Sequence, residues 1–263
     1  MLLVTYVAQF KCKRIYIDTM KDIKTHWDSV YSDPNKSQHT WSQPVPHLTL
    51  QLFDQLNLPK DAAIIDIGGG DSTLVDHLLE RGYSNLTVLD ISQNALMKSQ
   101  CRLGEKAALV NWICGNVMDL EHEQVFQLWI DRATFHFLQT PEEINRYREV
   151  LEKSTSAESK VILATFSETG PSQCSGLPVM RYSSYSLTDV FMTCFDRKIV
   201  VRENHKTPSE AEQKFIYVSF EKRKLGEQAN HYIGEDEFFS TETNPWEESN
   251  GSFCSIEQKG CCC

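Results

Sequence analysis

The sequence lacks several features that would assign it to other classes of protein. Its nine cysteines include no CxxC pair, which excludes the common spacing of a structural zinc site. No stretch approaches the roughly 20 consecutive apolar residues of a membrane-spanning helix. Lysine and arginine total 26 against 36 acidic residues, giving a net charge of −10. This deficit of cations disfavours a protein that binds bare nucleic acid.

The chain is long enough for one globular domain with extensions. Of its 263 residues, 41% are hydrophobic, which suffices for a packed core. We expect an N-terminal extension at 1–19, one domain at 20–226 and an acidic, disordered tail at 227–263. Cysteines scattered singly through the domain indicate a reducing compartment, and we expect the cytoplasm. The final cysteines, 261–263, resemble lipidated ends without matching a C-a-a-X box, so lipid anchoring and an unmodified end both stay open.

Apolar runs and helical patterns alternate along the domain. The pattern predicts strands at 62–67, 86–89, 110–114, 126–130, 160–165, 198–203 and 215–220. It predicts helices at 20–31, 47–58, 72–81, 94–103, 141–151 and 187–195. No long helix separates the last two strands, so they should form an antiparallel pair. The sequence therefore predicts a doubly wound α/β domain with a mostly parallel sheet of seven strands and an antiparallel strand at its C-terminal end.

Three consecutive glycines follow the first buried strand, in "IIDIGGGDS" (64–72). A dinucleotide-binding loop would carry a further glycine at position 73, where this chain has Thr73. The Gly-Lys-Ser/Thr of a phosphate-binding P-loop is also missing. Asp71 would repel a pyrophosphate, whereas a zwitterionic ligand could place its amino group beside Asp66 or Asp71.

These segments resemble the motifs of class I S-adenosylmethionine-dependent methyltransferases, which have a Rossmann-like fold. "IIDIGGGDS" is similar to their first motif, and "TVLDIS" ends in Asp90, which the resemblance assigns to the ribose hydroxyls. In "CGNVMDL", Asn116 stands where the family has an acid that contacts adenine. "LWIDRATFHFL" is similar to the fourth motif, in which Asp131 ends a strand. The cofactor residues that we expect are Trp41, Asp66, Gly68, Gly69, Gly70, Asp90, Ile91, Asn116, Val117 and Asp131.

A narrower resemblance concerns the methyl acceptor. "HWDSVY", Trp41, "RGYSNLTVLDIS" and "IDRATF" look like methyltransferase-like proteins that methylate lysines of translation elongation factors. Uncharacterised bacterial methyltransferases of small-molecule type also look similar. The lysine-directed group has Asp-Lys-Gly-Thr-x-Asp in the fourth motif, and this chain departs from it at Arg132, Ala133 and His136. The acceptor is therefore a protein side chain, such as lysine, or a small metabolite. We expect a monomer with no nucleic-acid partner and no metal.

Candidate residues for the acceptor lie after the fourth and fifth strands. His136 is the candidate base, with Asp131 beside it, although a hydrogen-bonded histidine at a helix start is the alternative. Arg132, Phe135 and Arg181 are the candidate contacts to the substrate. His205 is expected in the last hairpin, exposed to solvent. Trp41, in a proline-rich loop, should either line the cofactor pocket or cover the core.

Three other functions compete with an active protein or metabolite methyltransferase. A nicotinamide-dependent oxidoreductase would require the glycine that is missing at 73. A nucleic-acid methyltransferase would be expected to carry an Asn/Asp-Pro-Pro-Tyr motif or a basic domain, and the sequence has neither. A non-catalytic protein that binds the cofactor stays open, because Asn116 and His136 depart from the family pattern.

Overall fold

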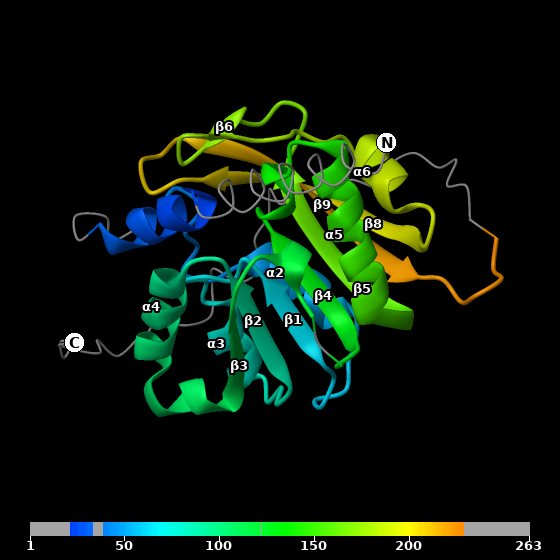
Figure 1. The fold of residues 1–263 in the computed structure, drawn as a ribbon, viewed down its shortest axis with the longest axis horizontal. Helices are drawn as coiled ribbons and strands as arrows, with labels where there is room; N and C mark the ends of the chain where they lie inside the picture. The colour runs from blue at the N-terminus through cyan, green and yellow to red at the C-terminus, as the bar shows by residue number, and fades with distance from the viewer. Residues whose placement is uncertain (1–21, 34–38, 122, 229–263) are drawn as a thin grey trace, which may run out of the picture.

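The computed structural model of the chain describes residues 22–33, 39–121 and 123–228 (Figure 1). Its strands are β1 (Ile64–Ile67), β2 (Leu86–Asp90), β3 (Val110–Cys114), β4 (Phe126–Arg132), β5 (Thr155–Phe166), β8 (Phe195–Lys206) and β9 (Glu212–Lys222), with a small pair β6 (Gln173–Cys174) and β7 (Leu177–Pro178). Its helices are one at 22–32, α2 (His47–Gln55), α3 (Leu74–Glu80), α4 (Gln93–Leu103), α5 (Pro141–Ser154) and α6 (Ser184–Phe191). Short 3-10 turns are η1 (Gly104–Leu109), η2 (Val117–Asp119) and η3 (Phe135–Phe137).

Seven strands form one sheet in the order β3-β2-β1-β4-β5-β9-β8. The first five are parallel to one another, and β9 runs antiparallel to both β5 and β8. The predicted Rossmann-like sheet, with one antiparallel strand near its C-terminal end, is confirmed. The strand order reverses between β1 and β4, and a crevice at the carboxyl ends of such strands is where doubly wound sheets bind ligands.

Helices cover both faces of the sheet and divide the core in two. On one face, α2, α3 and α4 pack Leu52, Leu74 and Leu96 against inward side chains of the strands. On the other face, α5 and α6 pack Tyr147 and Leu187 against the opposite set. Each central parallel strand is therefore buried on both sides, which explains why its sequence is a continuous apolar run rather than an alternating one.

Several boundaries differ from the sequence prediction for identifiable reasons. Strands β8 and β9 pair along almost their whole length, so both extend well beyond their apolar centres. His205 belongs to β8 and is buried, with Nε2 at 2.8 Å from the carbonyl oxygen of Thr40. The prediction that His205 is solvated was therefore wrong. Burial lowers the pKa of this histidine. Helix α6 begins early, at a capping box that Ser183 and Ser186 form.

Some predictions fall on residues outside the described ranges. The N-terminal extension, the terminal cysteines and nearly all of the acidic tail belong to this group. Within residues 22–33, 39–121 and 123–228, no helix is long and apolar enough to cross a membrane.

Candidate functional site

Two cavities meet at the carboxyl ends of β1, β2 and β4. The first has a volume of about 380 Å³ and the second about 560 Å³. They share Tyr31, Trp41, Gly68 and Arg132 as walls. The first cavity runs from Asp90, at the carboxyl end of β2, to Phe215, near the amino end of β9. The second cavity lies on the other side of the glycine loop. This is the crevice that the strand order predicts for a ligand.

The glycine loop passes through a space too narrow for side chains. Gly68 has φ +67°, and a Cβ there would lie 1.8 Å from Oγ1 of Thr134. Gly70 has φ +40°, and a Cβ there would lie 2.8 Å from Oδ2 of Asp90. A left-handed backbone and close packing thus both require glycine at these two positions. The result is a bare backbone at the edge of the cavity, which a ligand can approach closely.

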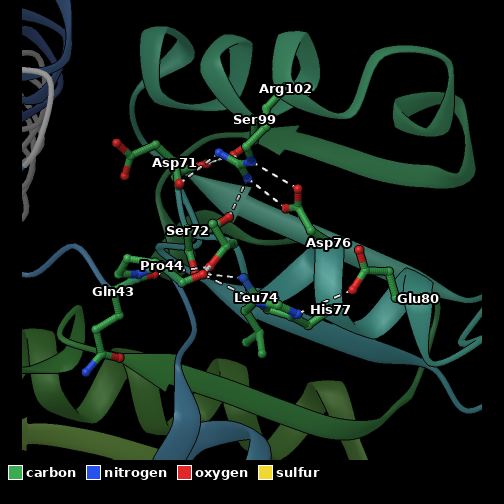
Figure 2. A network of polar contacts seen from close by, with 12 residues as sticks. Gln43, Pro44, Asp71, Ser72, Leu74, Asp76, His77, Glu80, Ser99 and Arg102 are labelled. Carbon is green, nitrogen blue, oxygen red and sulfur yellow. Dashed lines mark hydrogen bonds and ion pairs between the residues drawn. The ribbon is translucent and has the colours of Figure 1, made fainter. Parts of the chain in front are cut away.

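Arg102 of α4, which also lines the second cavity, holds this loop in place (Figure 2). Its Nη1 donates to the carbonyl oxygen of Asp71 at 3.0 Å, and its Nη2 donates to that of Ser72 at 2.7 Å. The same guanidinium pairs with both carboxylate oxygens of Asp76, at 3.0 and 2.8 Å. Ser99, one turn earlier on α4, donates its hydroxyl to the carbonyl oxygen of Gly70 at 2.7 Å. The loop is therefore fixed in place by side chains of α4.

Two buried carboxyl groups face the cavities from the ends of β1 and β2. Asp90 lines the first cavity, and burial raises its pKa to about 7, although its Oδ1 accepts the Ser92 amide at 2.8 Å. Asp66 lines the second cavity. Burial, with repulsion from Asp131 and Asp90, raises the pKa of Asp66 to about 8. Both acids would be stabilised in ionised form by a ligand that brings hydroxyl groups and an ammonium group.

Beside Asp90, the first cavity is lined by Ile91, Asn116 and Val117. Asn116 caps η2, since its Oδ1 accepts the amide of Met118 at 2.9 Å. Val117 is buried and offers an apolar surface. Asn116 therefore holds the local turn at the position where the family that the sequence resembles has an acid.

Aromatic side chains cover the cavity from the N-terminal side. Trp41 stacks on His39 at 4.6 Å between ring centroids, with an interplanar angle of 3°. Trp27 packs edge-on against Trp41 at 5.9 Å and against Phe137 at 5.2 Å. Tyr31 completes the group and lines both cavities. The structure thus places Trp41 at the wall of both cavities, where it also packs against the core.

The helix at 22–32, blue in Figure 1, is tied to α4 by polar contacts. Asp28 accepts the Ser92 hydroxyl at 2.8 Å, and its backbone carbonyl accepts the Asn94 side-chain amide at 2.9 Å. Lys24 pairs with Asp28 at 2.8 Å. The segment "HWDSVY" therefore supplies Trp27 and Tyr31 to the cavity and Asp28 to the anchor.

Five of the predicted site residues, Gly70 among them, are not in the lining of either cavity. Asp131 is fully buried, and its Oδ1 accepts the amides of Thr134 and Phe135 at 2.9 and 3.1 Å. Its Oδ2 accepts the Tyr147 hydroxyl at 2.7 Å, while burial raises its pKa to about 6. Phe135 is buried against Tyr147. This arrangement favours a structural role for Asp131, which orients the turn after β4.

His136 and Arg181 are also outside the lining of both cavities. His136 is fully buried, and its Nδ1 accepts the Phe166 amide at 3.3 Å. Burial and the nearby Arg132 charge lower its pKa to about 3, so the ring is neutral. Arg181 is exposed and donates to the carbonyl oxygen of Gly170 at 3.5 Å. The alternative of a hydrogen-bonded core histidine fits the position of His136 better than a base does.

Sequence reasoning missed several residues of the site. Trp27 and Tyr31 line the first cavity, as do Phe166 and Phe215 from the ends of β5 and β9. For Trp27 and Tyr31, the sequence signal was their spacing of four residues in "HWDSVY", because the helical period brings such residues to one face. Arg102 had no such signal, because a single arginine in an exposed helix is common.

Comparisons with known proteins agree with this geometry. Residues 64–154 match the family described as "Methyltransferase domain". The chain is 26% identical over 159 residues to EEF1A lysine methyltransferase 2 of Homo sapiens, covering 56% of this chain and 66% of that protein. It is 29% identical over 107 residues to malonyl-[acyl-carrier protein] O-methyltransferase of Anoxybacillus flavithermus (strain DSM 21510 / WK1), covering 40% of this chain and 39% of that protein. The chain thus spans less than two thirds of the length of these relatives.

Solved structures show the same fold. A methyltransferase of Burkholderia thailandensis that acts on 1,6-didemethyltoxoflavin aligns with a TM-score of 0.61 at 17% identity, covering 77% of this chain and 88% of that one. A methyltransferase from Anabaena variabilis ATCC 29413 aligns with a TM-score of 0.61 at 13% identity, covering 76% and 95%. The chain therefore has the fold of class I S-adenosylmethionine-dependent methyltransferases, and its residues 64–154 are similar to the methyltransferase domain family.

S-adenosylmethionine is the cofactor of this class, and its product S-adenosylhomocysteine is bound in the Burkholderia structure. The residues of the two cavities fit this group. Asp90 and Asp66 are buried acids at the cavity walls, and burial raises the pKa of both. The glycine loop leaves no room for a Cβ, and Val117 supplies an apolar wall. Within the described residues, no cluster of three or more His, Cys, Asp or Glu would hold a metal ion.

Proposed function

We propose that this protein transfers a methyl group from S-adenosylmethionine to a nucleophilic atom of an acceptor bound in the first cavity. The observation that carries the proposal is the continuity of that cavity. Asp90 and the glycine loop stand at one end, and an aromatic chamber beside Arg132 stands at the other. A cofactor and an acceptor can therefore occupy one space without a rearrangement of the fold.

Each wall of the cavity has a proposed task in binding. Asp90 would accept hydrogen bonds from the ribose hydroxyls, and Ile91 and Val117 would hold the adenine between apolar surfaces. Asp66 would face the amino group, and the bare backbone of Gly68 would allow the methionine chain to approach. The cofactor supplies a methyl group that its positively charged sulfur already activates.

The chain's remaining task is to position the acceptor and exclude water. The aromatic cover formed by Trp27, Tyr31 and Trp41 closes the cavity on the N-terminal side. Asp131 and His136 hold the turn η3, which brings Phe137 to the cavity wall. We propose these two residues as positioning residues rather than as a catalytic pair.

The acceptor class has two candidates among the relatives. One relative is by name a lysine methyltransferase, and another is by name an O-methyltransferase of malonyl-[acyl-carrier protein]. A non-catalytic cofactor-binding protein is the other reading of the same fold. The aromatic chamber beyond Gly68 supports an active enzyme, because side chains leave it open as part of the first cavity.

Binding of S-adenosylhomocysteine should strengthen as the pH rises from 6 to 8.5. The raised pKa values of Asp90, about 7, and Asp66, about 8, mean that the free protein holds protons on both acids at pH 6. Hydroxyl and ammonium groups of the ligand favour the ionised acids, so binding releases protons and becomes tighter at higher pH. Calorimetry at several pH values measures this directly, and an affinity that is constant over the range would contradict it.

The free protein should show the opposite trend. The folded-state pKa values of these acids lie above the model-peptide value of about 4, so the folded state holds protons that the unfolded chain releases. Their contribution to stability is full below about pH 4 and is lost as the pH rises through 7 and 8. Asp66→Asn removes one of the two protons and should reduce both trends.

Transfer of a labelled methyl group tests the function itself. Lysate incubated with the protein and cofactor carrying a radioactive methyl group should yield a labelled protein or small molecule, which mass spectrometry then identifies. An Asp90→Ala variant provides the background. A protein that binds S-adenosylhomocysteine but labels nothing above this background would favour the non-catalytic alternative.

A further inference from the structure

Given the proposed methyl transfer, we infer that Arg132 binds a carboxylate in the first cavity, and that this carboxylate belongs to a compact, largely apolar acceptor. A lysine ammonium would then be the wrong partner for this chamber. The inference rests on the geometry of one guanidinium group, the charges around it and the walls beside it.

Arg132 is held rigidly, with one nitrogen left over. Its Nε donates to the hydroxyl of Tyr217 at 3.0 Å, and its Nη1 donates to the carbonyl oxygen of Trp41 at 3.0 Å. Its Nη2 is buried and has no hydrogen-bond partner among the described residues. Arg132 lines both cavities where they meet. A planar guanidinium fixed on two sides presents its third nitrogen in a defined direction, as oxyanion recognition requires.

No described side chain neutralises this guanidinium by a direct ion pair. Glu203 acts on Arg132 electrostatically, but its carboxylate accepts the Tyr217 hydroxyl at 3.0 Å and the Gln43 amide at 3.1 Å. Tyr217 therefore stands between the two charges. Asp66 also lies near Arg132, but among the described residues no hydrogen bond or ion pair joins the two side chains. A buried cation without a paired anion is costly, and a ligand carboxylate would supply the missing charge.

The walls next to Arg132 are apolar. Phe215 lies under the guanidinium, with its ring centroid 5.1 Å from Cζ. Phe137, Phe166 and Leu177 continue this surface. Such walls favour a flat or branched hydrocarbon body attached to the carboxylate, and they offer little to a long, solvated lysine chain.

The first cavity also lacks an acid that would receive an ammonium group at this end. Its lining includes two acids, Asp90 and Glu143. Asp90 belongs to the opposite, nucleoside end. Glu143 closes the capping box of α5, since its Oε2 accepts the amides of Gln139 and Thr140 at 2.9 and 3.0 Å. A lysine acceptor would thus meet a positive charge and find no group near it to take its proton.

A carboxylate could also come from the amino-acid end of the cofactor, so the experiment has two arms. The first arm measures calorimetric binding of S-adenosylhomocysteine and of 5′-methylthioadenosine, which lacks the amino-acid part. The second arm saturates the protein with S-adenosylhomocysteine and compares phenylacetate with its neutral isostere phenylacetamide. Wild type, Arg132→Gln, Arg132→Lys and the control Arg181→Gln are measured in both arms.

We expect wild type and Arg181→Gln to bind phenylacetate at least about tenfold more tightly than phenylacetamide, and Arg132→Gln to lose that preference. Arg132→Lys should keep only part of this preference, because lysine lacks the forked pair of donors. This variant also tests the site if the glutamine variant does not fold. Affinity for S-adenosylhomocysteine should stay within about threefold of wild type in the Arg132 variants.

Other outcomes would overturn the inference in distinguishable ways. Loss of S-adenosylhomocysteine affinity in Arg132→Gln, with 5′-methylthioadenosine unaffected, would assign the arginine to the cofactor's carboxylate and refute the acceptor assignment. Equal binding of phenylacetate and phenylacetamide by wild type would refute an anion site for the acceptor. Failure of wild type to bind S-adenosylhomocysteine at all would instead refute the proposed function.

Discussion

Replacement of Asp90 by alanine should weaken binding of S-adenosylhomocysteine by about 100-fold or more. A carboxylate that accepts two ribose hydroxyls contributes two charge-assisted hydrogen bonds, each of about 1.5–3 kcal/mol, and about 1.4 kcal/mol corresponds to a factor of ten. The structure supports this role, since Asp90 is buried at the cavity wall and its Oδ1 is already oriented by the Ser92 amide at 2.8 Å.

Calorimetry of wild type, Asp90→Ala and Asp90→Asn measures this effect. Asparagine keeps the shape and one acceptor oxygen, so its loss should be intermediate. Asp61→Ala is the matched control, because Asp61 is exposed and precedes β1 at the opposite end of the sheet. Affinity in Asp90→Ala equal to that of wild type would remove Asp90 from the nucleoside site and with it the main support for the proposed function.

Replacement of Asp131 by alanine should destabilise the fold by about 3 kcal/mol or more, because leaving a buried donor without its acceptor costs about 1–3 kcal/mol and three donors are affected. The variant would leave the Tyr147 hydroxyl and the amides of Thr134 and Phe135 without their acceptor. Burial raises the pKa of this carboxyl to about 6, while the hydrogen bonds from Tyr147, Thr134 and Phe135 act in the opposite direction and stabilise the carboxylate. Asp131→Asn should cost less, since its oxygen still accepts the amide protons.

Urea denaturation of the free protein measures the stability of both Asp131 variants. Asp119→Ala, a change of an exposed acid in η2, controls for lost negative charge. If Asp131 has a structural role, its replacement lowers the unfolding midpoint in the absence of any ligand. Wild-type stability combined with abolished methyl transfer would instead restore Asp131 as a catalytic residue.

The strands of the sheet could be predicted from the sequence because each carries its own signal. Val110–Cys114 was placed without error, and β1 and β2 were placed within two residues. Parallel strands buried on both faces are continuous apolar runs, and the glycine loop is local to one strand and helix. The sequence pattern therefore predicts the strand-end positions of Asp90 and Gly68, which line the first cavity.

The acceptor end could not be predicted in the same way, because it depends on contacts between distant segments. Arg132 is fixed by Tyr217, which is 85 residues away, and the β4–β5 and β5–β9 pairings together bring the two residues to opposite sides of Ala164. The Phe-His-Phe pattern at 135–137 gave no orientation for its histidine. In a 3-10 turn, a shift of one residue along the chain changes whether a side chain points to the core or to the cavity. His136 lies in the core, and Phe137 lies at the cavity wall.

Helix α4 has a consequence for how the sequence can vary. Its first turn anchors the N-terminal helix through Ser92 and Asn94, and its last two turns hold the glycine loop through Ser99 and Arg102. One surface helix thus couples the cover of the cavity to its floor. Hydrophilic positions on an outer helix ordinarily tolerate substitution. In α4, however, a substitution that shifts the helix would move both the aromatic cover and the glycine loop.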